Sequence, residues 1–386
     1  MSGGPPGRPV VLVSGLGPVS KLGFGIDEFL ESLTRQASGY ASAPAEGAGR
    51  VPCAIPQFEL SEFITTSRAY PNPLARCALA AGAVALDDAY VLEDEMDPPR
   101  CGLAVASALG DPKREPLYVH AARGGGVDLA MPGEPAHGRL GPPADAMAAE
   151  LNLRGYQWNL CGDLLCGAQA MEAAWTALSS DRADLMLAGG VDVPGPAALG
   201  ELGVGAAGGV PLAQGAAILA LETQGALERR EGYAFCELGA VLCRSTEGRR
   251  SAGGLAELLR RTIEEAIAES GIWDGDVGAV FVCSGGAFFP PARDAERLAL
   301  SAFSQVPMST AKTFVGETFA AGFPMECILA AEVLNSGELP PRLVRMGTRQ
   351  GVEFWMRREN EALLGFTGLV AGCTADQVAA AVLKSI

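Results

Sequence analysis

Short apolar segments alternate with helical segments along the whole chain, and this alternation most constrains the fold. Apolar runs of the length expected for buried strands occur at residues 9–14, 101–107 and 277–283, and residues 185–192 are expected to give a strand and a glycine turn. Between such runs, apolar residues recur at helical spacing, as in residues 73–88. Alternating strands and helices predict an α/β protein in which helices cover sheets.

The same plan of strands and helices occurs in both halves of the chain. This repetition suggests an internal duplication, and we expect one half at residues 1–245 and a second at residues 246–386. The first predicted strand is followed by Gly15 and Gly17, where we expect a turn before a helix near residues 25–34.

The composition favours a large buried core. Hydrophobic residues make up 48% of the 386 residues and charged residues 19%, which argues against disorder. No apolar run is long enough to cross a membrane, and the first ten residues are polar rather than signal-like. We therefore expect a cytoplasmic protein without a membrane partner.

The net charge of −16 argues against a nucleic-acid partner, because phosphates are bound by basic surfaces. The basic pairs Arg249–Arg250 and Arg260–Arg261 are short, so they are interpreted as solvated surface.

The sequence predicts neither a metal site nor a cofactor. The ten cysteines are scattered, no CxxC occurs, and Cys161 and Cys166 have no histidine nearby, so buried free thiols are expected. The GxGxxG match at residues 203–208 lacks the preceding strand and following helix that dinucleotide binding requires.

Residues suited to acid–base or nucleophilic chemistry are few. The only histidines, His120 and His137, lie in a loop-like stretch without a neighbouring carboxylate, and no GxSxG motif occurs. Cys166 opens an Ala-rich helix, where backbone N–H groups can lower a thiol pKa. It is the best nucleophile candidate, but without an activating histidine a packing role is favoured.

Six segments in order resemble the β-ketoacyl synthase family over nearly the whole chain. They include DLMLAGGVD at residues 184–192, AQGAAILALE at 213–222, KTFVGETFAAG at 312–322 and a damaged GFGG at 365–368. The resemblance implies a thiolase-like, five-layer α-β-α-β-α fold built from two duplicated βα halves.

The resemblance also identifies the positions of the family's catalytic triad. Leu164 takes the place of the nucleophilic cysteine, Gly285 that of the first histidine and Glu317 that of the second, whereas Lys312 keeps the family's lysine. Cys166 falls two residues after the nucleophile position, about 200° around a helix, and should point elsewhere. No catalytic residue is therefore expected.

These replacements would remove the chemistry of condensation. A leucine cannot hold an acyl group, and a carboxylate at Glu317 opposes the negative charge that histidines stabilise in the family. A structural role for Glu317 is favoured, as a buried or half-buried ion pair with Lys312 that holds the loop.

A ketosynthase fold without its triad resembles the chain-length factors of type II polyketide and polyene systems. The resemblance implies a heterodimer with an active ketosynthase, acyl carrier protein served through that complex, and tunnel or structural roles for Leu164, Lys312, Cys166 and Phe366. Known chain-length factors usually carry Gln at the nucleophile position, so Leu164 makes a residual malonyl-decarboxylating role a weaker expectation. Two alternatives stay open: an acyltransferase or condensing enzyme of the thiolase superfamily that uses a non-standard cysteine such as Cys166, and a homodimeric scaffold or binding protein with no biosynthetic role.

Overall fold

The strands follow one path of hydrogen-bonded neighbours, β4-β3-β5-β6-β1-β7-β11-β10-β8-β9, with β2 paired to β1. The computed structural model describes residues 8–35, 53–110, 142–195, 211–246, 251–284, 289–337 and 367–386. The first half of the path contains Val11–Ser20 (β1), Gly23–Phe24 (β2), Cys101–Ser107 (β3), Gln157–Cys161 (β4), Leu185–Asp192 (β5) and Gly215–Thr223 (β6). The second half contains Cys236–Ser245 (β7), Val277–Ser284 (β8), Met308–Ser309 (β9), Thr367–Cys373 (β10) and Gln377–Lys384 (β11).

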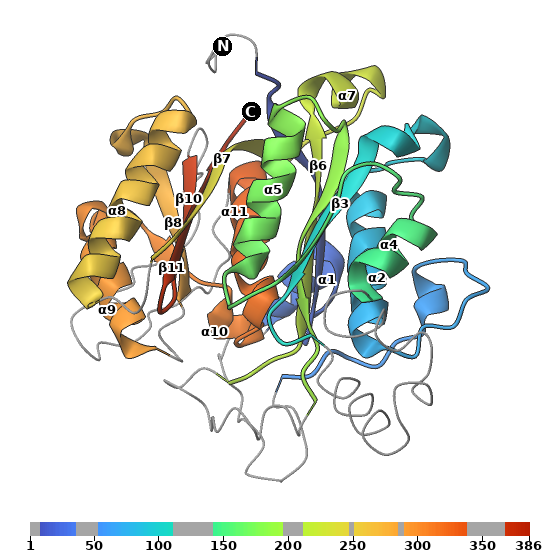
Figure 1. Cartoon of the computed structure of the whole chain (residues 1–386), viewed down its shortest axis with the longest axis horizontal. Coiled ribbons are helices and arrows are strands. Elements are labelled where there is room, and N and C mark those ends of the chain that lie inside the picture. The colour runs from blue at the N-terminus through green and yellow to red at the C-terminus, as the bar shows by residue number, and fades with distance from the viewer. Residues whose placement is uncertain are drawn as a thin grey trace, which may run out of the picture.

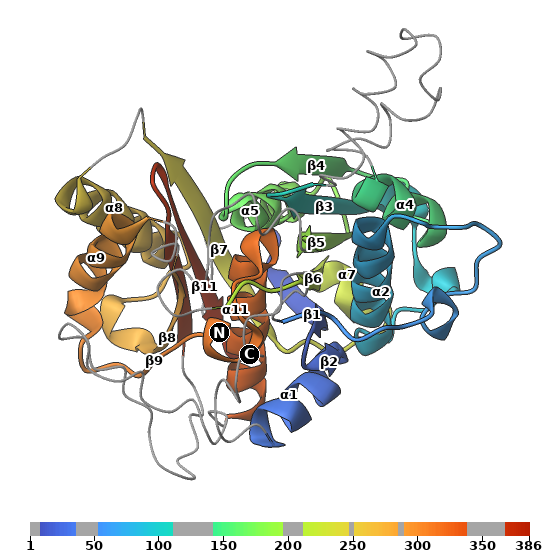
Figure 2. The same cartoon turned by 90° about the horizontal axis from the view of Figure 1, so that it is seen from below.

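Two helices lie between the two halves of this path (Figures 1 and 2). Cys166–Ser179 (α5) packs against β5 on one side and β7 on the other, and Gly322–Ser336 (α11) packs against β6 and β10. The outer faces are covered by Pro73–Asp88 (α2) and Pro142–Glu150 (α4) on one side and by Ala252–Glu269 (α8) and Pro290–Ala299 (α9) on the other. The remaining helices are Gly25–Arg35 (α1), Gln224–Arg229 (α7) and Lys312–Val315 (α10), with 3-10 turns at Leu60–Glu62 (η1), Glu93–Glu95 (η2), Pro98–Arg100 (η3), Asp274–Asp276 (η6), Leu300–Phe303 (η7) and Phe319–Ala321 (η8).

The predicted five-layer α-β-α-β-α fold is confirmed, and burial explains its sequence pattern. Strands β1, β3, β5 and β6 are buried along their whole length, because helices cover both faces of their sheet. The central helix α11 is buried almost all round, whereas the outer helix α8 has an apolar face and a charged face. The strands and helices therefore differ in polarity according to the layer they occupy.

The first strand differs from its prediction. Gly15 and Gly17, expected in a turn, lie inside β1, which continues to Ser20 with a bulge between Val13 and Gly15. A Cβ atom on Gly15 would lie 2.0 Å from the carbonyl oxygen of Ala85, and one on Gly17 would lie 2.1 Å from that of Ala81. The turn prediction was wrong because these glycines allow close packing of β1 on α2.

The two sides of the strand path meet where β1 pairs with β7. The sides are joined by only two residue pairs between β1 and β7, Leu12–Glu237 and Val13–Cys236. Strand β7 ends at Ser245, although it lies on the C-terminal side of that junction. The division into residues 1–245 and 246–386 stays a prediction.

Candidate functional site

Leu164 lies in the turn that leads into α5, and Asp163 shapes this turn. The backbone N–H of Leu165 donates to Asp163 Oδ1 at 2.9 Å, and the Thr374 hydroxyl donates to Asp163 Oδ2 at 2.5 Å. The carbonyl oxygen of Asp163 accepts from the N–H of Cys166 at 3.1 Å, so the helix begins at Cys166. Asp163 thus ties the nucleophile position to the end of β10, a link that the sequence analysis missed.

Leu164 and Cys166 belong to different apolar clusters. The half-buried Leu164 packs with Ala108 and Leu109 against the buried pair Leu212 and Phe319. Cys166 is fully buried in the main core, as expected for a residue that points away from Leu164. Burial raises the pKa of the Cys166 thiol, so the lowered pKa considered for this helix N-terminus is not found. The packing role of Cys166 is the better supported one.

Glu317 forms a buried ion pair with Lys312. Lys312 Nζ lies 2.7 Å from Glu317 Oε2, and the side chains are 6% and 0% exposed. Glu317 Oε1 accepts the backbone N–H of Phe319 at 2.9 Å. Both carboxylate oxygens therefore have a donor, and the ion pair expected between these two residues is confirmed.

The backbone of Glu317 is hydrogen-bonded to residues 211–213. The N–H of Glu317 donates to the carbonyl oxygen of Pro211 at 2.8 Å, and its carbonyl oxygen accepts from Ala213 at 2.9 Å. The preceding Gly316 has a φ of 92°, and a Cβ atom there would lie 2.7 Å from the Pro211 oxygen. Only glycine fits this conformation without displacing the neighbouring chain.

Lys312 stays charged although it is buried. Burial alone would lower the pKa of its ammonium group, but nearby negative groups, among them Glu317 and Glu296, outweigh burial and raise the pKa. Glu296 belongs to α9 and accepts the backbone N–H of Cys373 at 3.0 Å. Lys312 is thus an electrostatic centre for carboxylates from separate elements.

Two further buried carboxylates hold the site together, and the sequence analysis assigned neither of them a role. Asp192, at the end of β5, accepts hydrogen bonds of 2.7–3.0 Å from the Ser107 hydroxyl and from the backbone N–H groups of Ala108, Leu109 and Ala320. Burial raises the pKa of Asp192 to about 6. Asp192 lies in the quoted DLMLAGGVD segment, so only its position at a strand end could have identified it.

Glu326 fixes the start of the short helix that carries Lys312. Both of its carboxylate oxygens accept the backbone N–H of Ala311 at 2.9 Å, and Oε1 also accepts the Thr310 hydroxyl at 2.8 Å. Burial raises the pKa of Glu326 to about 7. Glu326 is part of the fully buried face of α11, which masks its polarity in the sequence pattern.

Close backbone contacts bring the Glu317 segment to the start of α5. A Cβ atom on Gly167 would lie 2.0 Å from the carbonyl oxygen of Ala320, and one on Gly190 would lie 2.1 Å from the same atom. The 3-10 turn η8 therefore rests directly on α5 and β5. Phe319 packs beside Leu164, so two of the three positions that the family resemblance predicts for the triad, Leu164 and Glu317, lie in neighbouring segments.

For the third expected triad position, Gly285, the structure describes only the strand that precedes it. Gly285 and Phe366 lie outside the described residues, as do His120, His137 and the GxGxxG match at 203–208. Strand β8 ends at Ser284, and Cys283 lies near Lys312: a Cβ atom on Gly322 would be 3.4 Å from Cys283 Sγ and 3.5 Å from Lys312 Cε. The strand before Gly285 therefore runs to the buried lysine.

Glu326 should make folding stability depend on pH. Because the folded-state pKa of Glu326 is raised, its contribution to the free energy of unfolding falls as pH rises from about 4.5 through about 7. Glu326→Gln removes this titration and keeps an acceptor oxygen for Ala311. We expect this variant to gain up to about 3 kcal/mol on the wild type between pH 5 and pH 8, measured by urea denaturation. Parallel pH profiles for the two proteins would contradict this assignment.

Among the described residues, no three His, Cys, Asp or Glu side chains are grouped so as to hold a metal ion. Within the same residues, no helix has the length and apolarity to cross a membrane. All ten cysteines are free, and Cys161 is the exposed one.

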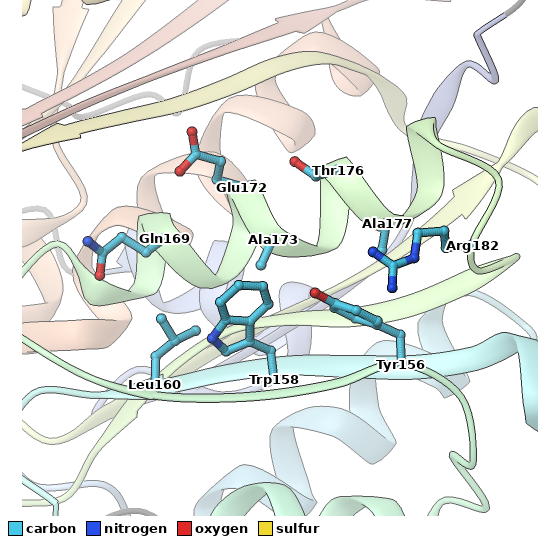
Figure 3. A pocket seen from close by; sticks show the side chains of 9 residues that line it. All are labelled: Tyr156, Trp158, Leu160, Gln169, Glu172, Ala173, Thr176, Ala177 and Arg182. Atoms are coloured by element: carbon cyan, nitrogen blue, oxygen red, sulfur yellow. The ribbon is translucent and has the colours of Figure 1, made fainter.

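A surface pocket of about 360 Å³ lies between β4 and α5 (Figure 3). Tyr156 and Trp158 line it from the β4 side, with their ring centroids 6.0 Å apart. Glu172 and Thr176 line it from α5, and Arg182 lies at its end beside Tyr156. The pocket lies at the end of the strand path formed by β4, against the α5 residues that face this strand.

The chain is similar in sequence to proteins of a known family. Residues 11–207, just over half of the chain, match the model of the family described as "Beta-ketoacyl synthase, N-terminal domain". The "Putative polyketide beta-ketoacyl synthase 2" of Streptomyces halstedii is 26% identical, over 86% of this chain and 86% of that protein.

Two solved structures share the fold. The ishigamide ketosynthase/chain length factor superposes with a TM-score of 0.79 at 17% identity, over 98% of this chain and 100% of that one. A type II polyketide ketosynthase in complex with its acyl-carrier protein, AntDE:AntF, gives a TM-score of 0.73 at 17% identity, over 98% and 100%. With the family match and the five-layer architecture, these findings establish that the chain belongs to the β-ketoacyl synthase family.

Proposed function

We propose that this chain is a non-condensing ketosynthase-like subunit, a chain-length factor, that pairs with an active ketosynthase and shapes its acyl-chain tunnel. The pathway would be type II polyketide, polyene or fatty-acid-like biosynthesis. The observation that carries the proposal is the buried Lys312–Glu317 ion pair at the expected second-histidine position. Glu317 also accepts the N–H of Phe319, which packs against Leu164 at the expected nucleophile position.

The side chains at these positions do not support condensation. Leu164 has no atom that can form a thioester, so no acyl group can be attached there. The Glu317 carboxylate accepts hydrogen bonds through both oxygens and has no proton to donate to a thioester carbonyl. Such a subunit would keep the family's fold and its surfaces for binding a partner subunit, but it would lack the nucleophile for condensation.

The comparisons support a partnership with a ketosynthase. The relative from Streptomyces halstedii is named "Putative polyketide beta-ketoacyl synthase 2", and the ishigamide structure contains a ketosynthase and a chain length factor. The AntDE:AntF structure contains an acyl-carrier protein on its ketosynthase. By analogy, we infer that acyl carrier protein reaches this chain only through the complex.

The free edge of the sheet offers a surface for that partnership. Among the described strands, β4 pairs only with β3, so its outer edge is left without a neighbour. Trp158 is 44% exposed there, in the pocket that faces α5 (Figure 3). Exposed sheet edges with large apolar side chains favour association, so we assign this edge to the ketosynthase.

Co-expression with a triad-bearing ketosynthase tests the partnership. We expect the two chains to purify together as a complex of equal stoichiometry, determined by native mass spectrometry. A stable homodimer that binds no such ketosynthase would favour the scaffold alternative instead.

Thiol labelling tests the acyltransferase alternative. Because burial raises the pKa of Cys166 and Cys161 is exposed, iodoacetamide should modify Cys161 and leave Cys166 unmodified in the folded chain. Peptide mass spectrometry after brief labelling gives the comparison. Rapid labelling of Cys166 with loss of an acyl-transfer activity would support the alternative.

A further inference from the structure

Phe319 has a backbone conformation that is rare for its residue type. Its φ is 54°, in the left-handed region, where a bulky side chain raises the energy of the backbone. Such a conformation persists only where the surrounding contacts enforce it, and it often marks a functional position. The side chain of Phe319 is nevertheless 2% exposed and forms the centre of a small apolar cluster.

Two buried carboxylates enforce this conformation. The N–H of Phe319 donates to Glu317 Oε1 at 2.9 Å, and the N–H of the next residue, Ala320, donates to Asp192 Oδ2 at 2.9 Å. Glu317 is itself fixed by Lys312 at 2.7 Å. The peptide groups on both sides of the Phe319 Cα atom are therefore anchored.

The anchored ring fills the space next to Leu164. Phe319 and Leu212 are the buried members of the cluster, and Leu164, Leu109 and Ala108 pack against them. This cluster is separate from the main core, which contains Cys166. Leu164 is only half-buried, so it lies at the exposed margin of the cluster.

We propose that Phe319 is a plug that closes this subunit's own acyl site, and that Glu317 is the positioning residue that holds it there. The three features then form one device: Leu164 removes the thiol, Phe319 occupies the adjoining volume, and Glu317 with Lys312 fixes the plug. An acyl chain is excluded from this site, which confines the elongating chain to the partner's nucleophile. This inference deepens the proposed function and rests on it for the assignment of Leu164 to the nucleophile position.

The test is a gain of acyl binding on removal of the plug. The full chain is titrated with S-octanoyl-N-acetylcysteamine, a neutral thioester probe, by isothermal titration calorimetry. We expect no saturable binding by the wild type over the concentrations tested. Phe319→Ala should bind with a dissociation constant at least tenfold below the highest probe concentration used. Leu164→Ala shortens a half-buried side chain of the same cluster, so this variant should fold. It should also bind the probe more tightly than the wild type.

Matched variants separate a plug from a general loss of packing. Phe303→Ala removes another buried phenylalanine, in the main core away from Leu164, and should bind no probe. Glu317→Ala should admit the probe, whereas Glu317→Gln keeps an acceptor for the Phe319 N–H and should exclude it again.

Some results would overturn the proposal. These are folded Phe319→Ala and Leu164→Ala variants that bind no tighter than the wild type, or equal binding by Phe303→Ala. The assay needs no ketosynthase, so a negative result leaves the non-condensing assignment standing. Condensation by the isolated chain would refute that assignment separately.

Discussion

Replacing Lys312 with methionine is expected to lower the free energy of unfolding by about 3–5 kcal/mol, because it removes the cationic partner of the buried Glu317 carboxylate. Glu317 is 0% exposed and lies 2.7 Å from the ammonium group, so its carboxylate is shielded from bulk water and, among the described residues, keeps only the Phe319 N–H as a donor. Methionine preserves most of the apolar stem of lysine, so the loss reflects the charge rather than a cavity. Urea denaturation of the purified chain at pH 7.5 measures the effect.

Two further variants control this prediction. The double variant Lys312→Met with Glu317→Leu removes both charges and should recover most of the lost stability, since an apolar pair can replace a buried ion pair. Arg260→Met removes an exposed cation that pairs with Glu257 and Glu264, and should cause a far smaller loss. A Lys312→Met protein as stable as the Arg260→Met protein would show that the ion pair does not hold the site.

Replacing Trp158 with aspartate is expected to weaken the complex with the ketosynthase by about 100-fold or more, the size typical of a central aromatic residue in an interface. Trp158 lies on the free edge strand β4, and Figure 3 shows it between Leu160 and Tyr156, facing α5. An aspartate there puts a charge on a surface that the partner would desolvate. Surface plasmon resonance with immobilised ketosynthase measures the dissociation constant.

Trp273→Asp is the matched control for this prediction. Trp273 is 81% exposed and precedes the η6 turn before β8, in the other half of the strand path from β4. This variant makes the same chemical change at a surface that we do not assign to the partner, so its affinity should equal that of the wild type. Equal affinities for Trp158→Asp and the wild type would remove β4 from the interface.

Much of the fold was predictable because its elements are continuous in the sequence. The strand at residues 101–107 and the helix at 73–88 have the predicted bounds, since each is an apolar segment ended by polar or turn residues. Strand β5 continues to Asp192 through Gly189 and Gly190, where a turn was expected. The ion pair of Lys312 and Glu317 was also predictable, because five positions separate its partners and the surrounding motif resembles a known family.

The missed features depend on contacts between distant parts of the chain. In the sequence, Gly15 and Gly17 are typical of a turn. Their role is visible only in the structure, where a Cβ atom on either residue would lie about 2 Å from a backbone oxygen of α2. Asp192 holds the N–H of Ala320, 128 positions away, and no local pattern marks that pairing. The left-handed conformation of Phe319 likewise has no signal in the sequence, because phenylalanine is not a residue that favours it.

As a non-condensing subunit, this chain should not join acyl and malonyl units by itself. The most direct measurement incubates the purified chain with malonyl- and acyl-loaded acyl carrier protein, alone and together with its ketosynthase, and detects the β-ketoacyl product by mass spectrometry. We expect no product above the protein-free background for the isolated chain, and product when the ketosynthase is present. Condensation by the isolated chain would contradict this expectation.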